Sequence, residues 1–170
     1  MDTLYLVIPC YNEEEVLPET SSQLKKKIVS LVAKGKISDK SRIVFVNDGS
    51  KDRTWEIITA LHEEDKIFQG IKLSRNKGHQ NALLCGLMTV KDHCDMTISL
   101  DADLQDDETA IISMARQVKD DGCDIVYGVR KERKTDTWFK RVTAQTFYRI
   151  MQTADKNILY NHADFRMMSK

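Results

Sequence analysis

The sequence predicts an α/β fold in which a mainly parallel sheet is covered by helices on both faces. Two observations lead to this fold class. Short apolar runs rich in β-branched and aromatic residues recur along the 170 residues, and segments with helical periodicity separate them. No internal repeat, low-complexity stretch or Pro/Gly-rich linker interrupts this alternation, so we expect one domain.

The expected strands and helices follow from these two patterns. Four clear apolar runs and one fainter run predict strands over 4–9, 42–47, 70–74, 96–101 and 124–129. The terminal segment "ADFRMMSK" is interpreted as one further strand. Apolar residues at helical spacing predict helices over 15–34, over 54–66, around Leu83, Leu87 and Val90, after Asp106 and Asp107, and over 137–154.

The composition excludes several functional classes. A hydrophobic content of 41% and a charged content of 31% are ordinary for a globular protein. The formal net charge is zero, so there is no basic field that would attract nucleic acid, and we expect no nucleic-acid partner. No apolar run reaches the roughly 18 residues of a transmembrane helix.

Polar residues gather where the expected strands end. Ligands of open parallel sheets bind outside the carboxyl ends of the strands, so these positions are the candidate binding residues. They are Pro9, Tyr11, Asn12 and Glu13 after the first strand, Asp48 after the second, Lys77 and Gly78 after the third, Asp101 and Asp103 after the fourth, and Arg130 and Arg133 after the fifth.

The most acidic of these segments is "ISLDADLQDDE", residues 98–108. Asp101 and Asp103 would repel each other at a strand end unless a cation lies between them. Two carboxylates at this spacing can hold Mg²⁺ or Mn²⁺, which prefer oxygen ligands. The alternative is a solvated turn or a helix cap, which suits Asp106 and Asp107 because they precede an apolar helix.

Two other strand ends favour a nucleotide. A carboxylate at Asp48 is placed to accept hydrogen bonds from a base or a ribose, although Asp-Gly-Ser is also a common turn and Asp52 could cap the following helix. Lys77 beside Gly78 at a helix start suits an anion, which by itself is weak evidence for phosphate binding. His79 can be read simply as part of the first turn of that helix.

The ordered motifs "VIPCYNEEEVL", "VFVNDGSKDRTWEII", "LSRNKGHQNALLCGL" and "LDADLQDDE" resemble the inverting glycosyltransferase family 2, which has the GT-A fold. Within that family, "DIVYGVRKER" and "DFRMMSK" resemble the polyprenyl-phosphate branch, which includes dolichol-phosphate mannose synthase and the bactoprenol glucosyltransferases. The resemblance covers essentially the whole chain. It therefore implies a single GT-A catalytic domain over residues 1–170.

The resemblance also implies roles for the matching residues. For the donor, it implies a nucleotide pocket formed by Pro9, Tyr11, Asn12 and Glu13, a contact of Asp48 with the base, and a bond from Asp101 to the nucleotide sugar. Asp103 and Gln105 would hold a metal on the diphosphate. Arg130 and Arg133 would bind the acceptor phosphate, and Asp164 and Arg166 would lie near the reacting sugar. Asp107 stands where members of the family often have Pro, a departure that concerns the local turn.

The implied activity is metal-dependent, inverting transfer of a hexose from a nucleotide sugar, with a donor of the UDP-glucose type favoured. The acceptor would be a polyprenyl phosphate used in cell-envelope glycan synthesis at the cytoplasmic face of the membrane. Relatives in this branch continue into membrane-associated helices, so we expect that a C-terminal membrane-associated part is missing and that the present fragment is soluble.

Three alternatives stay open at this point. A family 2 enzyme could use a saccharide acceptor, or the fragment could bind nucleotide sugars without activity. A phosphatase of the haloacid dehalogenase type also uses Asp-x-Asp after a strand, but its motif usually lies near the chain start with Thr or Val where Gln105 stands here. The sequence does not decide the nucleotide sugar, the acceptor or whether the chain forms a homo-oligomer.

Overall fold

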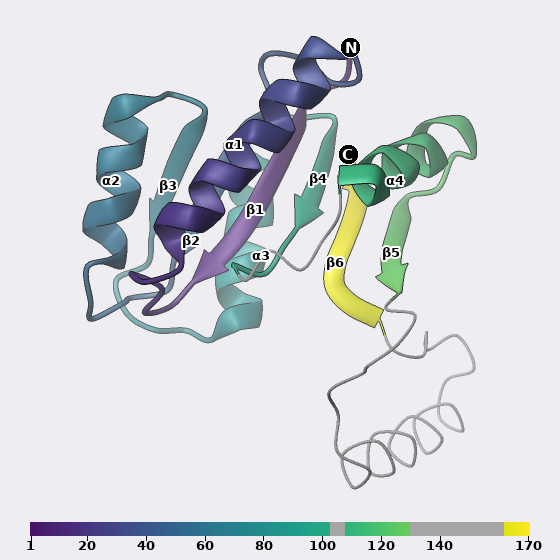
Figure 1. The fold of residues 1–170 in the computed structure, drawn as a ribbon. Helices are drawn as coiled ribbons and strands as arrows, with labels where there is room; N and C mark the ends of the chain where they lie inside the picture. The colour runs from purple at the N-terminus through teal and green to yellow at the C-terminus, as the bar shows by residue number, and fades with distance from the viewer. Residues whose placement is uncertain (103–107, 130–161) are drawn as a thin grey trace, which may run out of the picture.

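The computed structural model describes residues 1–102, 108–129 and 162–170, and the statements below concern these residues. A six-stranded sheet with the order β3-β2-β1-β4-β6-β5 forms the centre of the fold (Figure 1). Its strands are β1 (Leu4–Cys10), β2 (Arg42–Asn47), β3 (Phe68–Lys72), β4 (Met96–Ser99), β5 (Ile125–Val129) and β6 (His162–Ser169). The helices are α1 (Leu17–Ala33), α2 (Thr54–Glu64), α3 (His79–Val90) and α4 (Glu108–Asp120).

The sheet is mainly parallel, which confirms the predicted fold class. Strand β1 pairs in parallel with β2 and β4, and β2 pairs in parallel with β3. Strand β6 runs antiparallel to both β4 and β5, so β5 points in the same direction as β4. The carboxyl ends of β1 to β5 therefore face one edge of the sheet, and Asp48 and Asp101 both follow strands at this edge.

Several strand boundaries differ from the predicted ones by one or two residues. Strand β3 begins at Phe68, two residues before the predicted segment 70–74, because Phe68 fills a buried position beside Phe45 of β2. Strand β4 ends at Ser99 rather than at residue 101. As a result, Asp101 lies in the loop beyond the strand.

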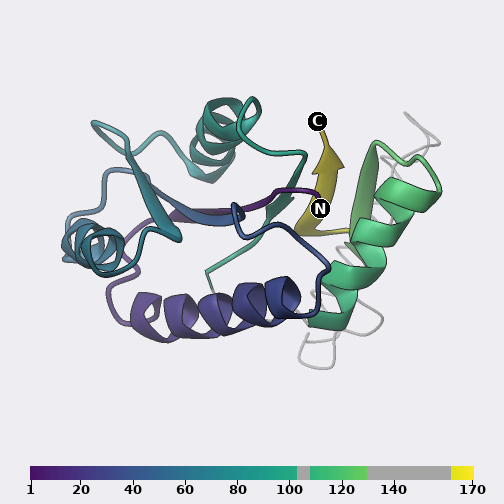
Figure 2. The same cartoon turned by 90° about the horizontal axis from the view of Figure 1, so that it is seen from above.

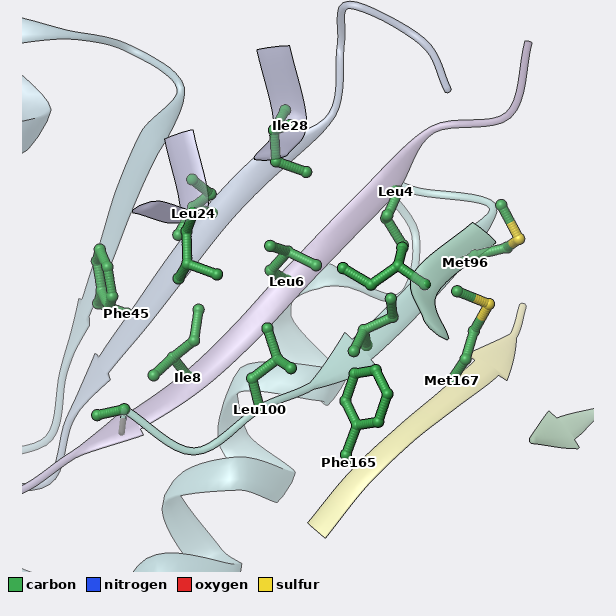
Figure 3. Packing of buried hydrophobic residues seen from close by; sticks show 14 of the residues in the cluster. Leu4, Leu6, Ile8, Leu24, Ile28, Phe45, Met96, Leu100, Phe165 and Met167 are labelled. Atoms are coloured by element: carbon green, nitrogen blue, oxygen red, sulfur yellow. The ribbon is translucent and has the colours of Figure 1, made fainter. Parts of the chain in front are cut away.

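The helices cover both faces of the sheet (Figure 2). Helix α3 packs on one face against Val7 and Val46. On the other face, apolar side chains from α1, α2 and α4 join one larger core, in which β1 supplies Leu4, Leu6 and Ile8 (Figure 3). Burying each such side chain stabilises the fold by about 1.5–3 kcal/mol, which fixes the strand ends that carry the site.

The first helix begins two residues later than the predicted segment 15–34. Val16 precedes α1 with 39% of its surface accessible, and Leu17 takes the buried place at the start of the helix. None of the helices in the described part of the chain is long and apolar enough to cross a membrane.

Candidate active site

The loops that follow β1 and β2 are joined by hydrogen bonds. The backbone N–H of Asn12 donates to the Ser50 hydroxyl at 3.0 Å, and the N–H of Lys51 donates back to Asn12 Oδ1 at 2.9 Å. Asn12 has a φ of 56°, a left-handed conformation that Asn adopts more readily than most residues. These reciprocal bonds hold two of the predicted pocket segments together.

A buried hydroxyl and a carboxylate extend this link. The N–H of Glu13 donates to Thr54 Oγ1 at 2.8 Å, and the N–H of Glu14 donates to Asp52 Oδ2 at 3.1 Å. Asp52 Oδ1 also accepts from the hydroxyl of Thr54 at 2.6 Å and from its backbone N–H at 3.1 Å. Asp52 thus stabilises the start of α2, as expected, and in addition fixes the loop after β1.

The ionisation of Asp52 reflects these bonds. Desolvation alone would raise the pKa of this carboxyl group, but the hydrogen bonds from Thr54 and from the Glu14 backbone together outweigh it. The net effect is a pKa below the usual value for Asp. The carboxylate is therefore ionised at neutral pH and acts as the acceptor that joins the two loops.

Asp48 lies at the centre of the candidate site and is almost fully buried, with 2% of its surface accessible. Its Oδ1 accepts from the backbone N–H of Lys77 at 2.7 Å, and its Oδ2 accepts from the N–H of Gly78 at 2.9 Å. The free carboxylate expected from the sequence is therefore engaged with the loop that precedes α3. Contact of Asp48 with a nucleotide base stays a prediction.

The same hydrogen bonds limit the ways in which the loop before α3 could bind an anion. The N–H of Gly78 also donates to Asn76 Oδ1 at 2.9 Å, so the N–H groups of Lys77 and Gly78 already face carboxylate or amide oxygens. The side chains of Arg75 and Lys77 are exposed. An anion at this loop would therefore be bound by these side chains rather than by the two backbone N–H groups.

The turn that contains Asp101 and Ala102 is contacted from both faces of the sheet. On one face, the Thr20 hydroxyl of α1 donates to the carbonyl oxygen of Ala102 at 2.6 Å, and both residues are buried. On the other face, Nε2 of His79, the first residue of α3, lies 3.8 Å from Oδ1 of Asp101. The sequence does not point to Thr20, and for His79 it predicts only a place in the first turn of a helix.

The remaining predicted pocket residues belong to the end of β1 and to the loop that follows it. Pro9 is buried within the strand, and Tyr11 is exposed over 40% of its surface. A pocket of about 390 Å³ lies at the loop after β1, where two predicted residues, Asn12 and Glu13, line it together with Glu14, Glu15, Val16, Lys51 and Asp52. Its carboxylates suit N–H donors, such as the edge of a base, better than they suit a diphosphate.

Several predicted residues fall outside the described part of the chain. These are Asp103, Gln105, Arg130 and Arg133. Asp164 belongs to β6, but its side chain also lies outside what the structure describes. Arg166, two residues further on, pairs in register with Ser99 of β4 and so stands close to the strand end that leads to Asp101.

The oxygen atoms of the predicted metal-binding side chains are chemically suited to a divalent metal ion. Within residues 1–102, 108–129 and 162–170, no group of three His, Cys, Asp or Glu side chains could hold an ion by itself. Asp101 places one carboxylate at the edge of the sheet. Asp103 and Gln105 would add a carboxylate and an amide oxygen, which gives the all-oxygen ligand set that Mg²⁺ and Mn²⁺ prefer.

The chain is similar to known glycosyltransferases. The model of the family described as Glycosyl transferase family 2 matches residues 5–170. The uncharacterized glycosyltransferase YkoT of Bacillus subtilis (strain 168) is 51% identical over 167 residues, which cover 98% of this chain and 49% of that protein. The prophage bactoprenol glucosyl transferase homolog of Escherichia coli (strain K12) is 38% identical over 168 residues, with coverage of 97% and 51%.

A solved structure shares the fold. The mannosyltransferase PcManGT from Pyrobaculum calidifontis, in complex with GDP-Man and Mn²⁺, superposes with a TM-score of 0.66 at 16% identity. The match covers 99% of this chain and 44% of that chain. The fold is therefore GT-A, and the chain spans about half the length of the curated relatives that it matches.

Proposed function

Because this chain belongs to glycosyltransferase family 2, we propose that it transfers a hexose from a nucleotide sugar to a polyprenyl phosphate, with inversion at the anomeric carbon. The choice of acceptor rests on the 38% identity to a bactoprenol glucosyl transferase homolog over 97% of the chain. A polyprenyl phosphate lies in a membrane, so the reaction would take place at the membrane surface, on the cytoplasmic side. The favoured donor is of the UDP-glucose type.

The donor would bind at the carboxyl edge of the sheet. Tyr11, Asn12 and Glu13 come from the loop after β1, and the segment of Lys77 and Gly78 is held beside them by Asp48. The supporting observation is that hydrogen bonds within the protein itself tie these loops to one another. A site ordered in advance loses less conformational entropy when the ligand binds.

Mg²⁺ or Mn²⁺ would be held by Asp103 and Gln105, with Asp101 at the sugar end of the donor. The ion, when bound, would neutralise negative charge on the diphosphate leaving group. Support comes from the oxygen donor set, and from the Mn²⁺ in the complex of the mannosyltransferase that has the same fold. Asp103 and Asp101 would otherwise repel each other.

The bond changes need no strong base. An oxygen of the acceptor phosphate, already an anion, attacks the anomeric carbon, and the bond from that carbon to the diphosphate breaks. The nucleoside diphosphate leaves with the electron pair, so no proton has to be removed from the acceptor. The protein must position two anions and exclude water, and Arg130 and Arg133 would hold the acceptor phosphate by their guanidinium groups.

The metal part of the proposal is tested by calorimetry with UDP and Mn²⁺. Asp103→Ala should abolish the Mn²⁺-dependent part of UDP binding, while the free energy of unfolding stays level or rises because a repulsive pair is relieved. Asp106→Ala is the matched control, since Asp106 fits a helix start, and it should bind as the wild type does. Unchanged Mn²⁺-dependent binding in Asp103→Ala would show that the clustered acids form only a turn.

The second candidate is a nucleotide-sugar-binding module without activity. It is favoured by one observation, that the chain spans about half the length of its relatives. Incubating the chain with UDP-glucose, Mn²⁺ and a short polyprenyl phosphate separates the two. Formation of glucosyl polyprenyl phosphate supports the enzyme, binding without product supports the module, and glucose transferred to an added saccharide would indicate a different acceptor class.

A further inference from the structure

We propose that His79 is a positioning residue that orients the carboxylate of Asp101 toward the sugar of the donor. This inference rests on the proposed function for its consequence, but its structural part can be tested on the free protein. His79 reaches Asp101 from α3, on the face of the sheet opposite to α1 (Figure 2). It would act on the reaction only through Asp101.

The backbone of His79 is fixed by its neighbours. Gly78, with a φ of 87°, lets the chain turn sharply into α3, and its N–H is held by the buried Asp48. The carbonyl oxygen of Lys77 accepts from Asn81 Nδ2 at 2.7 Å, which closes the first turn of the helix. The imidazole therefore projects from a backbone that has little freedom to move.

The backbone beside Asp101 is fixed independently. The bond of 2.6 Å from the Thr20 hydroxyl to the Ala102 carbonyl oxygen holds the turn from the face of α1. His79 can therefore act on the carboxylate of Asp101 from the opposite face without any movement of the main chain.

The distance between His79 and Asp101 suits this role. At 3.8 Å, Nε2 and Oδ1 are too far apart for a hydrogen bond but close enough for electrostatic attraction, and both side chains are about two-fifths exposed, at 42% and 39%. Contacts of this kind often tighten only when substrate is bound.

The arrangement also links the two ends of the donor site. Asp48 binds Gly78, and His79 follows directly and faces Asp101, so one short segment joins the strand end of β2 to that of β4. An error in the position of this segment would affect both the nucleotide side and the sugar side. We infer that this segment keeps the carboxylates of Asp48 and Asp101 in a fixed position relative to each other.

The first experiment measures the free protein by NMR. The ring carbon–proton signals of His79, identified by their loss in His79→Gln, should shift when Asp101 is replaced by Asn. Signals that stay unchanged in Asp101→Asn would overturn the proposal, whatever the protein's activity is. Signals of the other three of the four histidines serve as internal controls.

The second experiment measures binding of UDP and UDP-glucose with Mn²⁺. His79→Leu should reduce the preference for UDP-glucose over UDP by roughly tenfold, as is usual for groups that orient a ligand. Affinity for UDP and the melting temperature should stay near the wild-type values. His79→Gln should restore most of the preference because its amide N–H can replace Nε2, and the exposed neighbour substitution Gln80→Ala should have no effect.

A double-mutant cycle assigns the route of the effect. In the Asp101→Asn background, His79→Leu should change the preference for UDP-glucose no further, because the group that it orients is gone. Additive effects of the two substitutions would show that His79 is only structural. The same conclusion would follow if the lost preference for UDP-glucose in His79→Leu were accompanied by a matching fall in its melting temperature. Absence of any binding of UDP by the wild type would contradict the proposed function, and the NMR result would still decide the role of His79.

Discussion

The carboxylate of Asp48 accepts a hydrogen bond of 2.9 Å from the backbone N–H of Gly78, which lies 30 positions later in the chain. A second bond of 2.7 Å comes from the N–H of Lys77. Asp48 is thus a buried acceptor that shapes the loop before α3. Any contribution that it makes to nucleotide binding includes this indirect part, which the sequence alone does not indicate.

Removing the carboxylate should therefore affect both stability and binding. Asp48→Ala removes the carboxylate acceptor of the Lys77 N–H and one of the two acceptors of the Gly78 N–H, and we expect the free energy of unfolding to fall by about 1–3 kcal/mol. The affinity for UDP should fall as well, because the loop that carries Lys77 loses its anchor. Urea denaturation and calorimetry measure the two effects separately.

Asp48→Asn is the matched variant for this prediction. Its Oδ1 can still accept one bond, but its NH₂ group would face the second N–H donor, so the stability should lie between those of the wild type and Asp48→Ala. Equal stability of all three proteins would contradict the structural role. Weaker UDP binding at unchanged stability would instead indicate direct contact with the ligand.

A second prediction follows from the close approach of the loops after β2 and β3. Gly49 has a φ of 67°, and a Cβ atom there would lie 2.4 Å from the backbone carbon of Arg75. Gly122 has nearly the same φ, 66°, but a Cβ atom there would meet no atom within 4 Å among the described residues. The two glycines therefore separate backbone strain from steric contact.

Gly122→Ala should lower the free energy of unfolding by about 1–2 kcal/mol, the cost of a left-handed conformation for an L-residue. Gly49→Ala should lower it by clearly more, because the loop of Arg75 must also move. Thermal and urea denaturation of both variants measure the difference. Equal losses in the two variants would mean that the loop after β3 yields without cost.

The pKa of Asp52 leads to a prediction on acid stability. Because this pKa is lower in the folded protein than in the unfolded chain, the ionised carboxylate stabilises the fold at pH values above the unfolded pKa of about 3.9. This contribution is lost as the pH falls through the folded pKa. Asp52→Asn should therefore be less stable than the wild type at neutral pH, and the difference should shrink in acid.

Thr54→Val provides the control for this effect. It removes the hydroxyl that donates to Asp52, so the pKa of Asp52 should rise toward its usual value and the acid-dependent part of the stability should become smaller. Urea denaturation between neutral and acidic pH measures this dependence. A difference between Asp52→Asn and the wild type that is the same at every pH would contradict the assignment.

The fold was predictable because its signals are local. Apolar runs such as 42–47 form strands wherever they pack, and their ends place Asp48 and Asp101 at one edge. The position of β6 between β4 and β5 was not predictable, because strand pairing depends on the whole sheet rather than on the pattern of residues 162–169.

Other residues of the site could not be predicted, because their hydrogen-bond partners leave no pattern in the sequence. Thr20 donates to a backbone carbonyl 82 positions away, and a hydroxyl within an amphipathic helix gives no sign of such a partner. The partners of Asp48 are backbone N–H groups, which every residue except proline has. His79 was the one with a usable signal, since a titratable side chain began a helix at the edge where ligands bind.

The direction of β5 supports the prediction for the acceptor. Strand β5 runs parallel to β4, so its last residue, Val129, lies toward the same edge of the sheet as Asp101. Arg130 follows immediately in the sequence, and Arg133 is three positions further on. Basic residues at this edge would also gain from anionic lipids at a membrane surface.

Arg130→Ala and Arg133→Ala should each raise the KM for a short polyprenyl phosphate by roughly tenfold to a hundredfold, the effect of losing a hydrogen bond to a charged group. The corresponding Lys variants should recover only part of this loss, because Lys keeps the charge but not the two-pronged geometry of the guanidinium group. Lys131→Ala, in the same basic segment, should change the KM much less. Affinity for UDP, measured by calorimetry, should stay near the wild-type value throughout, whereas weaker UDP binding with an unchanged KM for the acceptor would mean that these arginines bind the donor.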